Sequence, residues 1–278
     1  MNTVEAVNIL GEFCGPRDIP RLDKKALFDR CGIEKADVFV LFGGSVAAGG
    51  DVLAEAVEAD IAGCYVIVGG EGHTTQTLRK NMRPYLKGLS AEGLPEAVLF
   101  DAYLRMRTGR SADFLETRST NCGNNITNLL SLLEKEGVEC SSMILCQDAS
   151  MQRRMAAGLA KYRSGIRAIN YAACRPVMEE KNGRLAYKTK IRGMWEPMRY
   201  ISLLMGEIER LSDTESGYGP RGKGFIAHVD IPYRVLEAFE ALKETFPDLA
   251  RKADPRYGHE REDFFPERKT LSPGQGRH

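Results

Sequence analysis

The sequence lacks the features of a membrane or secreted protein. It has no apolar run approaching the roughly 20 residues that a transmembrane helix requires. Its first ten residues have neither a basic start nor a long apolar core, so we expect no signal peptide. The seven cysteines are scattered without a Cys-x-x-Cys pair, which argues against a disulfide framework or a zinc site. These absences predict a reduced, cytoplasmic protein with no membrane insertion and no bound metal.

The sequence also has little excess charge. Its 39 basic and 38 acidic residues nearly cancel, so there is no overall electrostatic attraction to nucleic acid or to an anionic membrane. The glycine-rich segment 43–50 matches neither the Gly-x-Gly-x-x-Gly fingerprint nor the P-loop. This mismatch disfavours a nicotinamide-dependent dehydrogenase and leaves a small-molecule ligand of another kind as the expected partner.

A repeated pattern of strand, turn and helix is present instead. Four apolar runs each end in small or polar residues and lead into a helix-like stretch; the runs cover residues 37–42, 64–68, 114–118 and 142–146. A fifth strand is expected at 167–173. Strands that alternate with helices build a parallel sheet. We therefore predict a Rossmann-like α/β core of about five strands over residues 37–176.

The remaining sequence predicts a second, helical lobe. Apolar residues recur at helical spacing from Met194 to Leu211, and Pro232 suits the first turn of another helix. Residues 1–36 also have a helical pattern, so we assign 1–36 and 177–250 to this lobe. Residues 251–278 are charged and rich in Pro and Gly, which predicts a polar tail with little core of its own.

The first two loops after the strands contain candidate ligand contacts. Gly43, Gly44 and Ser45 follow the first strand, and glycines let the backbone approach a ligand closely. A tight turn is the alternative reading of these glycines. Gly70 and Glu71 follow the second strand, where an acid often binds ribose hydroxyls; a solvated loop carboxylate is equally compatible. His73 has no partner histidine nearby, so we interpret it as a loop residue.

The third loop has the highest density of polar side chains. Ser119 and Asn121 can cap a helix, but one cap leaves the other polar residues unexplained, including Asn125 one turn later. Amides and hydroxyls bind the polar edges of a ribose, a base or an amino acid. Cys122 lies near a helix start, which lowers a thiol pKa, although no base stands beside it in the sequence.

The fourth loop adds Gln147 and a pair of arginines, Arg153 and Arg154. Arginine commonly binds a carboxylate or phosphate. Successive helix positions point about 100° apart, so we expect only one arginine to face the site and select Arg154. Because the carboxyl ends of parallel strands lie on one sheet edge, we expect the four loops to form one composite site.

These segments resemble the bacterial YdcF family, within the SanA/ElyC/YdcF group. The segment 119–125 is similar to the family's Ser-Thr-Asn-Cys-Gly-Glu-Asn, and 151–154 to its Met-Gln-Arg-Arg. Segments 199–207 and 217–230 resemble the family most specifically. The resemblance spans about residues 37 to 245 and implies a Rossmann-like domain with a helical appendage. It also implies binding of S-adenosyl-L-methionine, with no settled reaction.

Two departures from the family and group patterns limit the expected chemistry. Asn124 stands where the family motif has Glu, which removes a carboxylate. The broader group often has His-Met-x-Arg in the fourth loop, but this chain has Met151 there, and Met cannot act as a base. The resemblance also links relatives to cell-envelope biology.

Two functions remain as hypotheses. The leading one is binding of an adenosine-type ligand, S-adenosyl-L-methionine above others, with methyl transfer as its natural extension. The alternative is a hydrolase or transferase that acts on a phosphorylated or cell-envelope precursor substrate. The glycine-rich segment 217–230 is either a mobile lid or a connection that docks on the first lobe, and we favour the connection.

Overall fold

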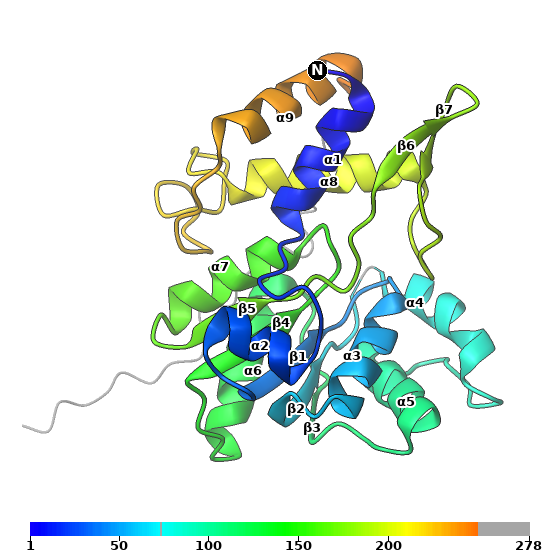
Figure 1. The fold of residues 1–278 in the computed structure, drawn as a ribbon, viewed down its shortest axis with the longest axis vertical. Helices are drawn as coiled ribbons and strands as arrows, with labels where there is room; N and C mark the ends of the chain where they lie inside the picture. The colour runs from blue at the N-terminus through cyan, green and yellow to red at the C-terminus, as the bar shows by residue number, and fades with distance from the viewer. Residues whose placement is uncertain (73, 250–278) are drawn as a thin grey trace, which may run out of the picture.

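The computed structural model describes residues 1–72 and 74–249. His73 and the tail expected at 251–278 therefore lie outside the described residues. Figure 1 shows an α/β core with a helical lobe beside it. Within the described residues, no helix is both long and apolar enough to span a membrane.

The core contains a five-stranded parallel sheet in the order β3-β2-β1-β4-β5. Its strands are β1 (Ala36–Phe42), β2 (Ala62–Val68), β3 (Phe114–Glu116), β4 (Ser142–Cys146) and β5 (Arg167–Asn170). The helices that follow or connect these strands are α3 (Ala48–Glu58), α4 (Thr75–Met82), the short η1 (Arg83–Tyr85), α5 (Glu96–Thr108), α6 (Cys122–Lys135) and α7 (Gln152–Tyr162). The predicted Rossmann-like class is confirmed.

The inner strands β1, β2 and β4 are buried on both faces, which explains why they are almost entirely apolar. In β1, Phe39 and Leu41 pack in the layer of α3 and α5. Val38 and Val40 point the other way and pack with residues of α6 and α7. This alternation of side chains along a strand places helices on both faces and leaves the carboxyl edge for the loops.

The second lobe packs around α1 (Thr3–Cys14), α8 (Pro197–Leu211) and α9 (Tyr233–Thr245). Their apolar faces form one cluster around the fully buried Tyr200. The lobe lies against the carboxyl edge of the sheet. Gly15 follows α1 and contacts Ala149 after β4, and Trp195 bonds Ser45 after β1.

Two parts of the predicted helical lobe differ in the structure. Residues after α1 pack with the α/β core, because Ile19, Leu22 and Leu27 of this segment and of α2 (Lys24–Cys31) share the cluster of Phe39. Residues 178–187, which we assigned to the helical lobe without a helix of their own, form an antiparallel hairpin of β6 (Met178–Lys181) and β7 (Arg184–Tyr187). The turn residues Asn182 and Gly183 both have positive φ angles, as a tight hairpin turn requires.

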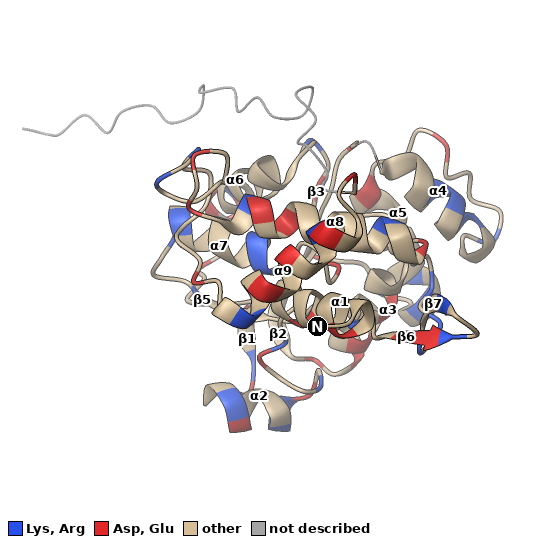
Figure 2. Cartoon of the chain, turned by 90° about the horizontal axis from the view of Figure 1, so that it is seen from above, with Lys and Arg blue, Asp and Glu red and all other residues tan. Residues whose placement is uncertain are grey.

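Charges of both signs are mixed over the surface. Figure 2 shows basic and acidic residues distributed among helices of both the core and the lobe. Some helices carry one sign only, since α3 has acidic residues alone and α7 basic residues alone, but the two signs balance over the sequence.

Candidate functional site

The loops at the carboxyl edge are joined into one continuous row. Gln147 after β4 donates its Nε2 proton to the Gly43 carbonyl after β1, at 2.8 Å. Gly43 in turn contacts Gly69 after β2. The Gly70 amide donates to the Ser119 carbonyl after β3, at 3.1 Å, and approaches the Ser119 hydroxyl at 3.3 Å. The sequence-based grouping of the four loops therefore corresponds to direct contacts.

The two glycines of the first loop have different surroundings. A Cβ atom on Gly43 would overlap the Glu96 carboxylate and lie 3.2 Å from the Gly69 Cα atom, so this position requires glycine for packing. A Cβ atom on Gly44 would lie 3.3 Å from Gln147 Oε1 and 3.5 Å from Asp148 Oδ2. Gly44 therefore borders two polar atoms without being enclosed by backbone.

Asp148 is the most unusual polar group at this edge. Its side chain is buried, and Oδ1 accepts hydrogen bonds from the Ser150 amide at 2.9 Å and hydroxyl at 2.6 Å. Among the described residues, the buried Oδ2 has no hydrogen-bond partner. Burial, more than any other effect, raises the pKa of Asp148 to about 6. The carboxyl therefore lacks a donor that a ligand or a water molecule would supply.

Ser45 connects the first loop to the helical lobe. Its hydroxyl accepts a hydrogen bond from the Trp195 indole at 2.8 Å, and its carbonyl accepts one from Asn81 at 3.0 Å. Its side chain is buried. The predicted ligand contact is thus part of the boundary between core and lobe, immediately beside Gly44.

Glu71 lies at the solvent side of the second loop. Its side chain is 64% exposed and pairs with Arg79 at 2.8 Å. The buried carboxylate here is Glu96, at the start of α5, which accepts a hydrogen bond from the Thr75 hydroxyl at 2.8 Å. Burial raises the pKa of Glu96. Sequence reasoning missed Glu96, because nothing in the sequence places the start of α5 beside Gly43.

The polar residues of the third loop mostly build the start of α6. Asn121 caps the helix, with Oδ1 accepting from the Asn124 amide at 2.9 Å, and its Nδ2 donates to Asn124 Oδ1. Asn125 is buried one turn into the helix. Cys122 is half-buried, and burial raises its thiol pKa. This corrects the expectation of a lowered pKa, since loss of solvent outweighs the charge of Arg154, which lowers the pKa.

The two arginines of α7 have separate roles, as their angular spacing predicts. Arg153 places its guanidinium 4.1 Å from the centre of the Phe13 ring and thereby holds α1. Arg154 forms a bidentate ion pair with Glu207 of α8, at 2.6 and 2.8 Å. Their side chains are 13% and 4% exposed. Arg154 is therefore buried between core and lobe.

Arg154 and Asn121 line one small cavity of about 90 Å³. The remaining lining comes from α6, α7 and the segment after α8, namely Cys122, Gly123, Ile126, Gly158, Tyr162, Tyr218, Phe225 and Ile226. Ser45 and Glu71 do not line this cavity. The candidate site thus has two parts, a buried carboxyl at Asp148 and a separate cavity at Arg154. The two parts interact electrostatically, because the charge of Arg154 lowers the pKa of Asp148 while burial raises it.

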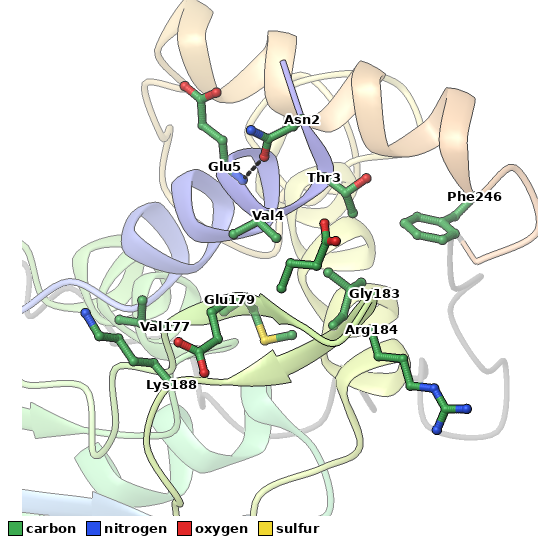
Figure 3. Close-up of a pocket in the computed structure, with 13 residues that line it drawn as sticks. Asn2, Thr3, Val4, Glu5, Val177, Glu179, Gly183, Arg184, Lys188 and Phe246 are labelled. Atoms are coloured by element: carbon green, nitrogen blue, oxygen red, sulfur yellow. Dashed lines mark hydrogen bonds between the residues drawn. The ribbon is translucent and has the colours of Figure 1, made fainter.

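A larger groove of about 780 Å³ lies in the helical lobe, between the start of α1, the β6–β7 hairpin and Phe246. Figure 3 shows Glu179 and Lys188 on one side of it and Thr3, Arg184 and Phe246 on another. Its labelled polar side chains come from the two ends of the hairpin and the first turn of α1. Among the described residues, no buried unpartnered polar atom belongs to its lining, so the carboxyl edge remains the candidate site.

Comparison with known protein families gave no match to any family model. The resemblance to the YdcF family thus depends on the sequence motifs quoted above. Within the described residues, no cluster of three His, Cys, Asp or Glu side chains is arranged to hold a metal ion.

Proposed function

We propose that the protein binds a small adenosine-type ligand, S-adenosyl-L-methionine first among the candidates, at the carboxyl edge of its sheet. One observation carries this proposal: the buried, unpartnered Oδ2 of Asp148 beside Gly44. A buried acceptor without a partner costs about 1–3 kcal/mol, which a donor on a ligand would offset. S-Adenosyl-L-methionine offers such donors in its ammonium group, ribose hydroxyls and adenine amino group.

The position of Asp148 supports the same proposal. In the strand order β3-β2-β1-β4-β5, the chain reverses direction across the sheet between β1 and β4. Open α/β sheets bind ligands in the crevice at such a switch point, outside the carboxyl ends of the strands. Gly44 and Asp148 follow these two strands, and Gln147 bridges the same pair of loops.

The charges around the edge favour a donor-rich cation over a phosphate. Three arginines here already have carboxylate partners: Arg79 pairs with Glu71, Arg154 with Glu207 and Arg192 with Asp51. The buried carboxyl groups of Asp148 and Glu96 add negative charge whenever they ionise. A phosphorylated substrate would be repelled by this negative charge, whereas the sulfonium and ammonium of S-adenosyl-L-methionine would be attracted to it.

Different residues of the chain would bind different groups of the ligand. Asp148 would accept a hydrogen bond from the ammonium or a ribose hydroxyl, and Asn121 would hold a polar edge. Arg154 donates two of its five N–H groups to Glu207, so a ligand carboxylate would share the guanidinium with that residue. When bound, S-adenosyl-L-methionine supplies an activated methyl group, which makes methyl transfer the reaction to test after binding.

Mass spectrometry of small molecules released from the purified protein tests this proposal. We expect an adenosyl compound, or, from protein purified empty, a stoichiometric uptake of added S-adenosyl-L-methionine. A phosphorylated metabolite found in its place, with no uptake of the adenosyl ligand, would contradict the proposal and support the hydrolase or transferase alternative.

A further inference from the structure

The cavity at Arg154 is covered on one side by a segment of the helical lobe. Tyr218, Phe225 and Ile226, which follow α8, form one of its walls. The cavity volume of about 90 Å³ is far below the roughly 300–1,000 Å³ typical of ligand pockets. A molecule of adenosyl size therefore reaches Asn121 and Arg154 only if this wall moves.

This wall belongs to a compact loop that holds its own shape. The Lys223 amide donates to the Gly217 carbonyl at 2.9 Å, and the Phe225 amide donates to the Tyr218 carbonyl at 2.8 Å. The rings of Tyr218 and Phe225 meet edge to face, with centroids 5.2 Å apart. Residues 217–222 have Gly-x-Gly-x-x-Gly spacing but form turns between α8 and α9, so the glycines serve close packing within the loop. Such a loop can move as a unit.

The loop is bonded to α7 of the core. The Ala227 amide donates to the Ala157 carbonyl of α7 at 3.0 Å, and Lys161 of α7 donates to the Gly224 carbonyl. At the base of the loop, His228 bonds Asp213 through Nδ1 and Asp230 through Nε2. These bonds confirm that the segment docks on the first lobe. On its other side the Tyr218 amide donates to the Arg210 carbonyl of α8 at 2.8 Å, and Ile226 is buried in the apolar cluster of the lobe. Opening of the loop away from the cavity would break its bonds to α7.

We propose that residues 213–228 form a cover over the Asn121–Arg154 cavity, that this cover opens to admit the ligand, and that the Asp213–His228–Asp230 cluster latches it. The ligand part of this inference rests on the proposed function. The opening itself does not, because Cys122 lines the cavity behind the cover and its thiol reports access without any ligand.

The test uses the full chain with Ala157→Cys and Ala227→Cys. The 3.0 Å bond between the backbones of these residues brings them close together, as a disulfide between them requires. The protein is oxidised, freed of oxidant and treated with iodoacetamide, and alkylation of each cysteine is followed by mass spectrometry. Cys31 of α2, half-buried and outside the cavity, serves as the internal control.

We expect the oxidised protein to alkylate Cys122 at least about tenfold more slowly than the reduced protein, with Cys31 unchanged. In the protein without added cysteines, His228→Ala should speed Cys122 alkylation severalfold, which tests the latch without any cross-link. An unchanged rate of Cys122 alkylation in the oxidised protein, or in the His228→Ala variant, would contradict the proposal that residues 213–228 form a cover.

The same samples test the proposed cover and the proposed ligand independently. Reduced protein should bind S-adenosyl-L-methionine and oxidised protein should not. If Cys122 is gated as expected but neither form binds the adenosyl compound, the cover stands and the proposed function fails. If both forms bind it equally, the ligand enters by another route and the cover is rejected.

Discussion

Arg154 and Glu207 face each other across the boundary between the α/β core and the helical lobe, joined by two hydrogen bonds of 2.6 and 2.8 Å. Arg210 approaches the same carboxylate at 3.5 Å. Removing one partner of a buried ion pair leaves the other charge uncompensated, which lowers the free energy of unfolding by about 3–5 kcal/mol. This ion pair therefore holds the lobe over the site as well as positioning the guanidinium.

Glu207→Gln should accordingly lower the free energy of unfolding by about 3 kcal/mol. Urea denaturation measures this change. The control is Glu5→Gln, which removes an exposed pair with Arg234 whose side chains are 45% and 69% exposed and should cost less than about 1 kcal/mol. Equal losses in the two variants would show that the buried pair does not join the lobe to the core.

The two glycines of the first loop should respond differently to alanine. Gly43→Ala would collide with Glu96 and Gly69 and should destabilise the fold by about 1–3 kcal/mol. Gly44→Ala meets no backbone, but its methyl group would lie 3.3 Å from Gln147 Oε1, which a small shift of that side chain relieves, and 3.5 Å from Asp148 Oδ2. We expect Gly44→Ala to keep near-normal stability and to lose ligand affinity, measured by calorimetric titration. A Gly44→Ala protein with unchanged affinity would remove Gly44 from the site.

Asp148 should make stability depend on pH in a known direction. Its pKa is raised from 3.8 to about 6, so the folded state resists its ionisation. The resulting penalty is absent below pH about 4, grows with pH and is complete above about 6. Asp148→Asn removes it, and should raise stability at pH 7 by up to about 3 kcal/mol with little change at pH 4.

Thermal unfolding at the two pH values measures this difference. Asp29→Asn, which alters an exposed helical pair with Lys25, provides the control and should show no comparable gain. A gain of equal size at pH 4 and pH 7 would mean that the carboxyl is not the source of the effect.

His228 has the opposite pH dependence. Hydrogen bonds to Asp230 and then Asp213 raise the pKa of His228 above 6.5. Two cations lie near this cluster: Arg221, 4.0 Å from Asp213, and Lys161, which is bound to the Gly224 carbonyl. The stabilisation is complete below pH about 6.5 and is lost as the pH rises through the raised value. The difference in melting temperature between the wild type and His228→Gln should therefore be largest near pH 6 and shrink by pH 9. A constant difference would argue against a charged latch.

The fold was predictable where burial left a simple pattern. Strands such as β1, buried on both faces, read as continuous apolar runs, and the helices between them showed apolar residues at helical spacing. The β6–β7 hairpin escaped prediction because its strands are largely exposed and have no apolar alternation. The Asn182–Gly183 turn was its one clear signal, since this pair favours a two-residue hairpin turn.

The candidate site was only partly predictable. Gly44, Gln147 and Asn121 lie in the loops that follow strands, so their position in the sequence was sufficient to group them. Glu96, Trp195 and Glu207 reach the same edge from α5, from the segment before α8 and from α8 itself. Their proximity is produced by tertiary packing, and no local pattern encodes it. For the same reason, the unpartnered oxygen of Asp148 emerged only from the structure.

The central claim is that the carboxyl edge binds an adenosyl ligand through Asp148, and a thermal shift measurement tests it most directly. A ligand at 100 times its dissociation constant stabilises the folded state by about 2.7 kcal/mol, and each kcal/mol moves the melting temperature of a protein of this size by roughly 2–4 °C. S-Adenosyl-L-methionine should raise it by about 5–10 °C, S-adenosyl-L-homocysteine nearly as much, and Asp148→Asn should lose most of the shift. No shift with either compound, from protein stripped of bound ligand, together with a shift from a phosphorylated metabolite, would contradict the claim.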